Sequence, residues 1–118
     1  MPVYPRSAGG GGAGGYSANC QATDIPDASE VRFLRFTVPA GKTCNIIAAS
    51  VYPSGVAGHV VEVYNITDAL SEYSTNSSFA EGAPLATIAA GKEVLFRVSN
   101  TSGAERTGSL GWVAFAVE

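Results

Sequence analysis

The chain has 118 residues, a net charge of −3 and an apolar fraction of 46%, which fits one domain with a hydrophobic core of ordinary size. Charged residues make up only 14% of the chain and its seven cations are scattered singly, so we expect no nucleic-acid partner. No run of about 18 apolar residues occurs, so we expect no membrane-spanning helix. The N-terminus lacks the apolar stretch of a signal peptide, and its Met-Pro start favours a protein made and used inside a cell.

The N-terminal region is predicted to be an arm. Two prolines favour an extended start, and every residue from 8 to 15 is glycine or alanine. As a glycine-rich coil, residues 7–15 span roughly 16 Å on average and about 30 Å when stretched, so the tip can reach a neighbouring subunit. We predict that the arm becomes ordered on contact with a partner. Its predicted partner-binding residues are Val3, Tyr4, Pro5, Arg6 and Tyr16.

The packed domain is expected at residues 30–118, after an arm and a turn-rich connector that together cover residues 1–29. Within the domain, runs of β-prone residues with alternating apolar and polar side chains predict short strands. These strands fall at 31–38, 43–51, 59–65, 85–88, 93–98 and 110–117. Between them we expect a single helical turn at 67–72, a long loop or edge strand at 73–82, and a surface loop at 100–108.

A turn that leads into a strand occurs twice. The pattern Thr-x-x-Ala-Gly-Lys is found at 37–42 and again at 87–92. In the strand after the second copy, Val94 and Phe96 fall on one face and are predicted to face the core. Leu95 falls on the other face, where a solvated sheet prefers a polar residue, so we predict that Leu95 contacts a partner.

Short strands at a spacing of about 8–12 residues, without a long helix, predict an all-β antiparallel two-sheet sandwich with an extended N-terminal arm. The pattern leaves jelly-roll and immunoglobulin-like topologies open. In the last strand, Val113, Phe115 and Val117 are predicted to face the core, which leaves Trp112 on the outer face. There the indole could stack on a sugar ring, fill a subunit interface or lie beneath a loop, and we predict that it binds a partner.

No group that could carry catalysis stands out. The only histidine, His59, follows a glycine and is typical of a surface or turn position, and no spacing selects a pair of catalytic carboxylates. The glycine-rich run lacks the strand, the helix and the Lys-Ser/Thr pair of a phosphate-binding loop. We therefore predict a protein that is not an enzyme and binds no cofactor.

The two cysteines, Cys20 and Cys44, are compatible with one disulfide or with two buried free thiols. A reducing cytoplasm favours the free thiols. Because no Cys-x-x-Cys pair and no Cys/His cluster occurs, no metal site is expected.

Two known families resemble this sequence. The phrases at 36–42, 61–64 and 91–100 resemble the pre-peptidase C-terminal type of bacterial sandwich domain, and that resemblance implies only the fold, because the calcium-linked acidic residues of that group have no clear counterpart. The whole layout, an arm before a single β-domain without an export signal, is similar to tailed-bacteriophage head decoration (cement) proteins. This resemblance implies a domain on the outside of a capsid, commonly a trimer, with arms that lace onto neighbouring subunits.

These observations lead to the prediction of a virion structural protein that cements a capsid by binding the major capsid protein. It would be made in the host cytoplasm and located on the capsid exterior as a homotrimer. One alternative is a glycan-binding module in which Trp112 and either Tyr73 or Phe79 form stacking platforms. Another is a phage tail or fibre accessory protein.

Overall fold

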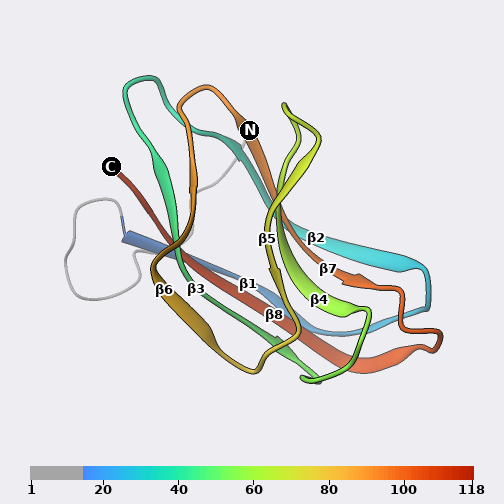
Figure 1. Ribbon diagram of the computed structural model, residues 1–118. Coiled ribbons are helices and arrows are strands. Elements are labelled where there is room, and N and C mark those ends of the chain that lie inside the picture. The colour runs from blue at the N-terminus through green and yellow to red at the C-terminus, as the bar shows by residue number, and fades with distance from the viewer. Residues whose placement is uncertain (1–14) are drawn as a thin grey trace.

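In the computed structural model, residues 15–118 form two four-stranded antiparallel sheets without a helix, and residues 1–14 lie outside the described part of the chain. This arrangement confirms the predicted all-β antiparallel sandwich (Figure 1). The strands are β1 (Gly15–Ile25), β2 (Ser29–Thr37), β3 (Cys44–Tyr52), β4 (His59–Asn65), β5 (Leu70–Thr75), β6 (Ala80–Ile88), β7 (Glu93–Asn100) and β8 (Arg106–Val117).

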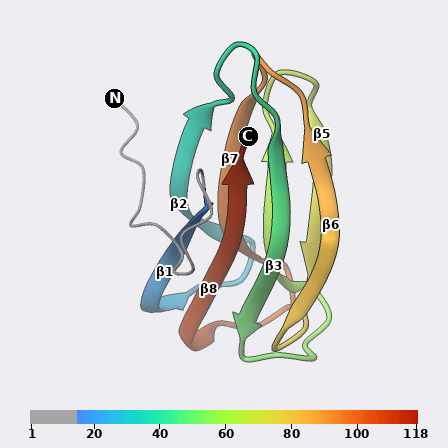
Figure 2. The same ribbon diagram turned by 90° about the vertical axis from the view of Figure 1, so that its left-hand side faces the viewer.

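The strands follow the jelly-roll order. Sheet A has the order β1-β8-β3-β6, and sheet B has the order β2-β7-β4-β5. The antiparallel pairs β1 with β8, β2 with β7, β3 with β6 and β4 with β5 are those of one long ribbon that turns back after β4 and is rolled into two layers. Figure 2 shows sheet A in front of sheet B. The strand order thus decides between the two topologies that the sequence leaves open.

The sandwich begins at Gly15, earlier than predicted. Residues Ala18 and Cys20 of β1 face the core and are buried, whereas Asn19 between them is exposed. Tyr16 and Ile25 also pack against the core, but Ala18 and Cys20 between them are small, so the alternation has little contrast over the middle of the strand. Residues 15–29 therefore belong to the sandwich, and the predicted arm is wrong for that part of its length.

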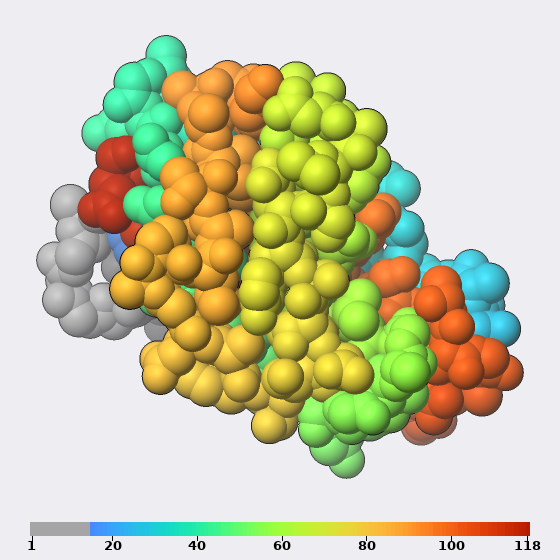
Figure 3. Space-filling view, viewed as in Figure 1, coloured from blue at the N-terminus to red at the C-terminus, as the bar shows by residue number. Residues whose placement is uncertain are grey.

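Strands β5 and β6 occupy most of the region where a helical turn at 67–72 and a long loop or edge strand at 73–82 are predicted. Ala69 has a left-handed φ of 52°, which is incompatible with a continuing helical turn, and Leu70 then starts β5. β5 is an edge strand with polar residues on both faces, so its sequence lacks the alternation of a half-buried strand. β5 and β6 lie side by side and cover one side of the sandwich (Figure 3).

The two copies of the turn pattern lie against each other. Gly41 and Gly91 have φ values of 75° and 82°, a backbone conformation that glycine adopts without strain. The backbone N–H of Val38 donates to the carbonyl of Lys92 at 2.9 Å, and the N–H of Gly91 donates to the carbonyl of Val38 at 2.8 Å. The repeated sequence therefore builds a matched pair of turns at one end of the sandwich.

Three phenylalanine rings form the centre of the core. Phe36 from β2, Phe96 from β7 and Phe115 from β8 are each at most 2% exposed, and their ring centroids lie 5.1 to 5.9 Å apart. The prediction that Val94 and Phe96 face the core is confirmed. Gly111 lets the sheets approach closely, since a Cβ at this position would collide with the side chain of Val98. The sandwich is therefore packed without spare room at this point.

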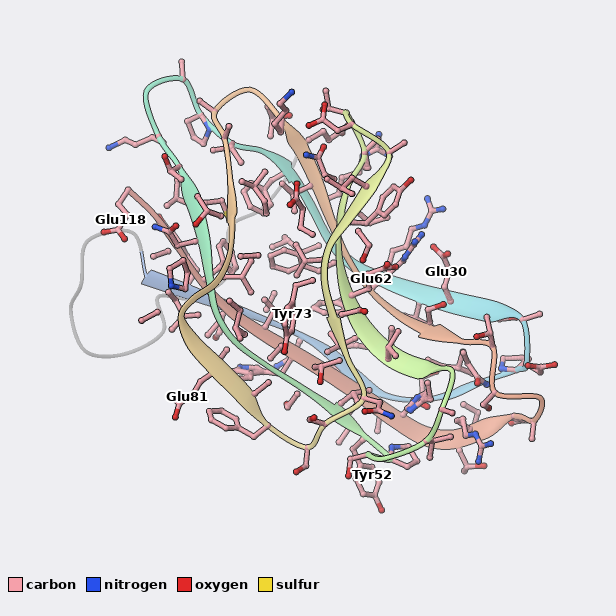
Figure 4. All side chains as sticks on the ribbon, viewed as in Figure 1. Glu30, Tyr52, Glu62, Tyr73, Glu81 and Glu118 are labelled. Carbon is pink, nitrogen blue, oxygen red and sulfur yellow. The ribbon has the colours of Figure 1, made fainter. Side chains whose placement is uncertain are left out.

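The outer face of sheet B is covered by ion pairs. Arg97 contacts Glu62 at 2.7 Å and Glu30 at 3.1 Å, and its guanidinium lies 4.7 Å from the centre of the Tyr64 ring. Figure 4 shows Glu30 and Glu62 projecting on the same side of this sheet. Arg35 also pairs with Glu93, at 2.7 Å. The charges on this face are thus neutralised within the chain.

Leu95 lies beneath this charged layer. It is only 3% exposed, although it points away from the core, and its cross-strand neighbours are Arg35 and Tyr64. Long side chains of this kind cover apolar surface with their stems while their polar ends stay in water. Leu95 is therefore not accessible for the predicted partner contact in this structure.

Both cysteines are free and buried, as predicted. Their register partners on β8 are Gly111 for Cys20 and Val117 for Cys44. Six residues of a strand separate these partners, or roughly 20 Å, which is far beyond the reach of a disulfide. Free thiols are therefore imposed by the geometry and carry no information about the redox state of the compartment.

We expect both thiols to be inert in the folded protein. Burial raises the pKa of Cys44 to about 12 and also raises the pKa of Cys20, so neither residue forms the reactive thiolate at about pH 8. Ellman's reagent should detect no thiol in the native chain and two in guanidinium chloride. A Ser50→Cys variant, with its thiol on the outer face of sheet A, should react in the native state and serves as the control. Rapid reaction of the native wild type would contradict this expectation.

Candidate functional site

A shallow groove of about 540 Å³ crosses the outer face of sheet A, the face turned toward the viewer in Figure 2. It lies over the middle of β1, the last residues of β3 and the central part of β8. The side chains that form its walls and floor come mainly from alternate positions of these strands, which point away from the core. The lining residues are Asn19, Cys20, Gln21, Ala22, Ser50, Val51, Tyr52, Ser78, Leu110, Gly111 and Trp112.

Large apolar side chains stand around the groove. The half-buried Trp112 stacks on Phe79, with ring centroids 6.3 Å apart and planes 24° apart. Tyr52 and Leu110 are register partners on β3 and β8, and they are 60% and 42% exposed. Figure 4 shows Tyr52 projecting from the end of β3. Exposed aromatic rings gathered at one place are a common feature of binding surfaces.

The lining of the groove includes four polar side chains and no charged one. Asn19 and Gln21 contribute amides from β1, and Ser50 and Ser78 contribute hydroxyl groups. These groups can donate and accept hydrogen bonds without the desolvation cost of a buried charge. The groove is thus suited to a neutral, mainly apolar ligand surface with a few hydrogen-bonding groups.

The two outer faces of the sandwich differ sharply in charge. The four strands of sheet B contain seven charged residues, whereas β3 contains none and the other strands of sheet A contain one each. The charged residues of the sheet A strands are Asp24, Glu81 and Arg106. Sheet B therefore presents a charged face, and sheet A presents a nearly uncharged face, which can be covered by a partner with less desolvation of ions.

The predicted partner-binding residues that lie within 15–118 are at three separate places. Tyr16 stacks on Phe115 with ring centroids 5.5 Å apart, so it packs against the core. Leu95 is buried on the opposite sheet. Residues 3–6 lie outside the described part of the chain. Only Trp112 is both on an outer face and at the groove, where the predicted pairing with Phe79 is present. Tyr73 instead packs against the core from β5.

Two residues of the groove walls escape the sequence reasoning. Tyr52 and Leu110 are two of the five exposed large hydrophobic residues of the described chain. Tyr52 lies two residues after Ser50 in β3, and Leu110 lies two residues before Trp112 in β8, so all four point to the outer face once β3 and β8 are paired. The spacing is visible in the sequence, but the pairing of these two strands is not.

His59 is completely buried, which corrects the prediction of a surface or turn residue. Its Nδ1 lies 2.9 Å from the carbonyl oxygen of Pro53, and its Nε2 lies 3.0 Å from the hydroxyl of Ser109. Ser109 is also fully buried, so this Ser-His contact has no access to a substrate. The contact joins β4 of sheet B to β8 of sheet A and is structural.

The remaining polar clusters are accounted for by internal contacts. The amide of Asn65 donates to Asp68 at 3.1 Å and to Glu72 at 2.9 Å, and Lys92 pairs with Asp68 at 3.0 Å. Within residues 15–118, no three His, Cys, Asp or Glu side chains gather in a way that could hold a metal ion. The same residues include no helix long and apolar enough to cross a membrane.

No protein-family model and no curated protein sequence matches this chain. Among solved structures, a similar fold occurs in PliG from Aeromonas hydrophila, a periplasmic inhibitor of g-type lysozyme. The alignment covers 93% of this chain and 91% of that chain, with a TM-score of 0.52 and 12% sequence identity. At this level of identity the likeness shows a common fold.

This comparison overturns the predicted relationship to phage head decoration proteins. A fold that matches nearly the whole chain is found in a periplasmic inhibitor protein from a bacterium. The predictions of a capsid cement, a major capsid protein as partner, a homotrimer and a location on the virion exterior are corrected accordingly. The glycan-binding and tail-fibre alternatives gain no support from it either. The prediction erred because it rested on the layout of an arm before a β-domain, whereas residues 15–29 are part of the sandwich.

Proposed function

We propose that this protein is a non-enzymatic inhibitor that binds a lysozyme-like, cell-wall-degrading enzyme through the outer face of sheet A. The observation that carries the proposal is the uncharged, aromatic groove on that face. Inhibition by a partner protein needs no catalytic group on the inhibitor, only a surface that stays bound and blocks access to the enzyme. The similarity of this fold to that of PliG, over nearly the whole of both chains, supports the choice of partner class.

The physical properties of sheet A favour tight binding. Interface hot spots are enriched in tryptophan and tyrosine that fill well-packed, desolvated pockets, and here Trp112 and Tyr52 flank one groove. Because no charged side chain lines the groove, burial of this surface avoids the desolvation cost of an unpaired ion. The groove would form the centre of a contact, and the neutral strand surface around it would supply the rest of the roughly 800 Å² per partner that stable interfaces bury.

The outer face of sheet B is a poorer candidate. Its arginines already contact glutamates of neighbouring strands, so a partner would have to compete with the existing ion pairs of Arg97 and Arg35. Leu95, the apolar residue of that face, is covered. A protein partner therefore gains more from sheet A than from sheet B.

We expect the full chain to inhibit a g-type lysozyme and Trp112→Ala to weaken the inhibition constant by at least about 30-fold, the effect of one hot-spot residue of 2 kcal/mol or more. The measurement is lysis of peptidoglycan at increasing inhibitor concentration, combined with calorimetric titration of the enzyme. Leu70→Ala is the matched control, because Leu70 is 50% exposed but lies on β5 of sheet B.

Two outcomes would refute the proposal. If the protein neither binds nor inhibits lysozymes of the g-type or of other structural types, the proposed class of partner is wrong. If Trp112→Ala and Leu70→Ala weaken inhibition equally, in variants with unchanged circular dichroism, the groove is not the binding surface.

A further inference from the structure

We propose that the sheet A groove selects a basic partner surface, in which an apolar side chain enters the groove while lysine or arginine side chains around it pair with Asp24 and Glu81. The preference for a basic surface stands on the charges beside the groove. Its assignment to a lysozyme-like enzyme rests on the function proposed above.

Asp24 and Glu81 lie on the two edge strands of sheet A, on either side of the groove. Asp24 follows the lining residue Ala22 on β1, and Glu81 follows the lining residue Ser78 and belongs to β6. Two or three residues of extended chain cover at most about 11 Å. Both carboxylates are therefore close enough to pair with side chains that surround a group bound in the groove.

Both carboxylates point away from the core. Asp24 is exposed while the next residue, Ile25, is completely buried, and the backbone N–H of Gly108 donates to the Asp24 carboxylate at 2.9 Å. Glu81 is exposed, and its register partner on β3, Ala48, is not part of the core cluster. Figure 4 shows Glu81 projecting from β6 away from the sandwich. A partner that covers the groove therefore meets both side chains.

The chain does not neutralise these two charges. Within residues 15–118, every ion pair involves other residues, and most of these pairs lie on sheet B. The one cation in the strands of sheet A is Arg106, whose Nε donates to the hydroxyl of Ser102 at 2.7 Å, in the loop before β8. The groove is thus an uncharged centre with uncompensated negative charge beside it.

This arrangement favours a partner with an apolar centre and a basic margin. Interfaces commonly have an apolar centre and a polar rim, and charges at the rim act mainly on the association rate and on the choice of partner. Exposed carboxylates attract a basic surface and repel an acidic one over roughly 10 Å at moderate salt. The net charge of −3 on the whole chain acts in the same direction.

Two capped tripeptides test this preference without a lysozyme. Lys-Phe-Lys and Glu-Phe-Glu carry the same ring between opposite charges, and the emission of Trp112, the single tryptophan of the chain, reports binding at the groove. At low salt we expect Lys-Phe-Lys to bind the full chain at least about threefold more tightly. The double variant Asp24→Asn with Glu81→Gln should lose this preference. The matched control, Glu30→Gln with Glu93→Gln, removes the same total charge from sheet B and should keep it.

Association kinetics with a g-type lysozyme provide the second measurement. The association rate constant of the wild type should fall by at least about fivefold from low to physiological salt, and that of the Asp24/Glu81 double variant should fall less. Equal binding of the two peptides, no binding of either, or a preference that both double variants keep would overturn the inference. A peptide preference without binding of any lysozyme would refute the proposed function alone, whereas inhibition of a lysozyme without the peptide preference would refute only the basic margin.

Discussion

Replacement of Phe96 by alanine lowers the free energy of unfolding by about 3–5 kcal/mol, the largest loss that we expect from a single truncation in this chain. Phe96 is completely buried, and its ring meets Phe36 and Phe115 at interplanar angles of 90° and 83°. The variant removes the ring that both other rings contact at nearly a right angle, and it leaves a cavity between the two sheets. Denaturation by urea, followed by circular dichroism, measures the change.

The matched control is Phe79→Ala, which deletes the same side chain at a position that is 54% exposed. Its loss should be about 1 kcal/mol or less, because only the stacking on Trp112 disappears. A Phe96→Ala variant as stable as Phe79→Ala would contradict the arrangement of the core. Because domains of this size are stable by only about 5–15 kcal/mol, the Phe96 variant should also populate unfolded molecules at physiological temperature.

The strands that can be predicted from the sequence are those whose inward residues are large. β7 has Val94, Phe96 and Val98 at its inward positions, and β2, β3 and β4 are likewise found close to their predicted positions. β1 has Ala18 and Cys20 at its inward positions, and β5 is a polar edge strand, so neither shows the contrast on which the method depends. Weak alternation, not absence of structure, explains both errors.

The site is harder to predict, because it depends on which strands become neighbours. Trp112 can be placed on an outer face from its parity alone, and the structure agrees. Its companions Tyr52 and Phe79 come from segments far away in the chain, and they reach Trp112 only because β3 lies between β8 and β6. Leu95 is the opposite case. Its alternate position in the strand correctly predicts that it points away from the core, but its cross-strand neighbours bury it there. Whether an outward-facing side chain is exposed depends on the residues of the neighbouring strands, so the sequence pattern of one strand cannot predict it.

Removal of the His59 side chain should destabilise the protein by about 2–4 kcal/mol, since His59→Ala leaves a cavity and a partly buried carbonyl without its donor. The carbonyl oxygen of Pro53 can only accept, so Nδ1 carries a proton, and in the neutral ring Nε2 is then an acceptor for the Ser109 hydroxyl. That hydroxyl also lies 3.0 Å from the carbonyl oxygen of Arg106 and can donate to only one of the two acceptors at a time. The histidine thus connects the loop after Tyr52 to β8 immediately before Leu110, directly behind two walls of the groove.

A double-mutant cycle distinguishes this network from simple packing. If His59 and Ser109 stabilise the fold through their mutual contact, the loss in the double variant His59→Ala with Ser109→Ala should be smaller than the sum of the two single losses by about 0.5–3 kcal/mol. His59→Asn should recover part of the stability of His59→Ala, because its amide can still donate to the Pro53 carbonyl. Additive losses, or equal stability of the Asn and Ala variants in urea denaturation, would show that His59 only fills space. The sequence gives no sign of this contact, because Pro53, His59 and Ser109 come from three segments that meet only after the ribbon is rolled.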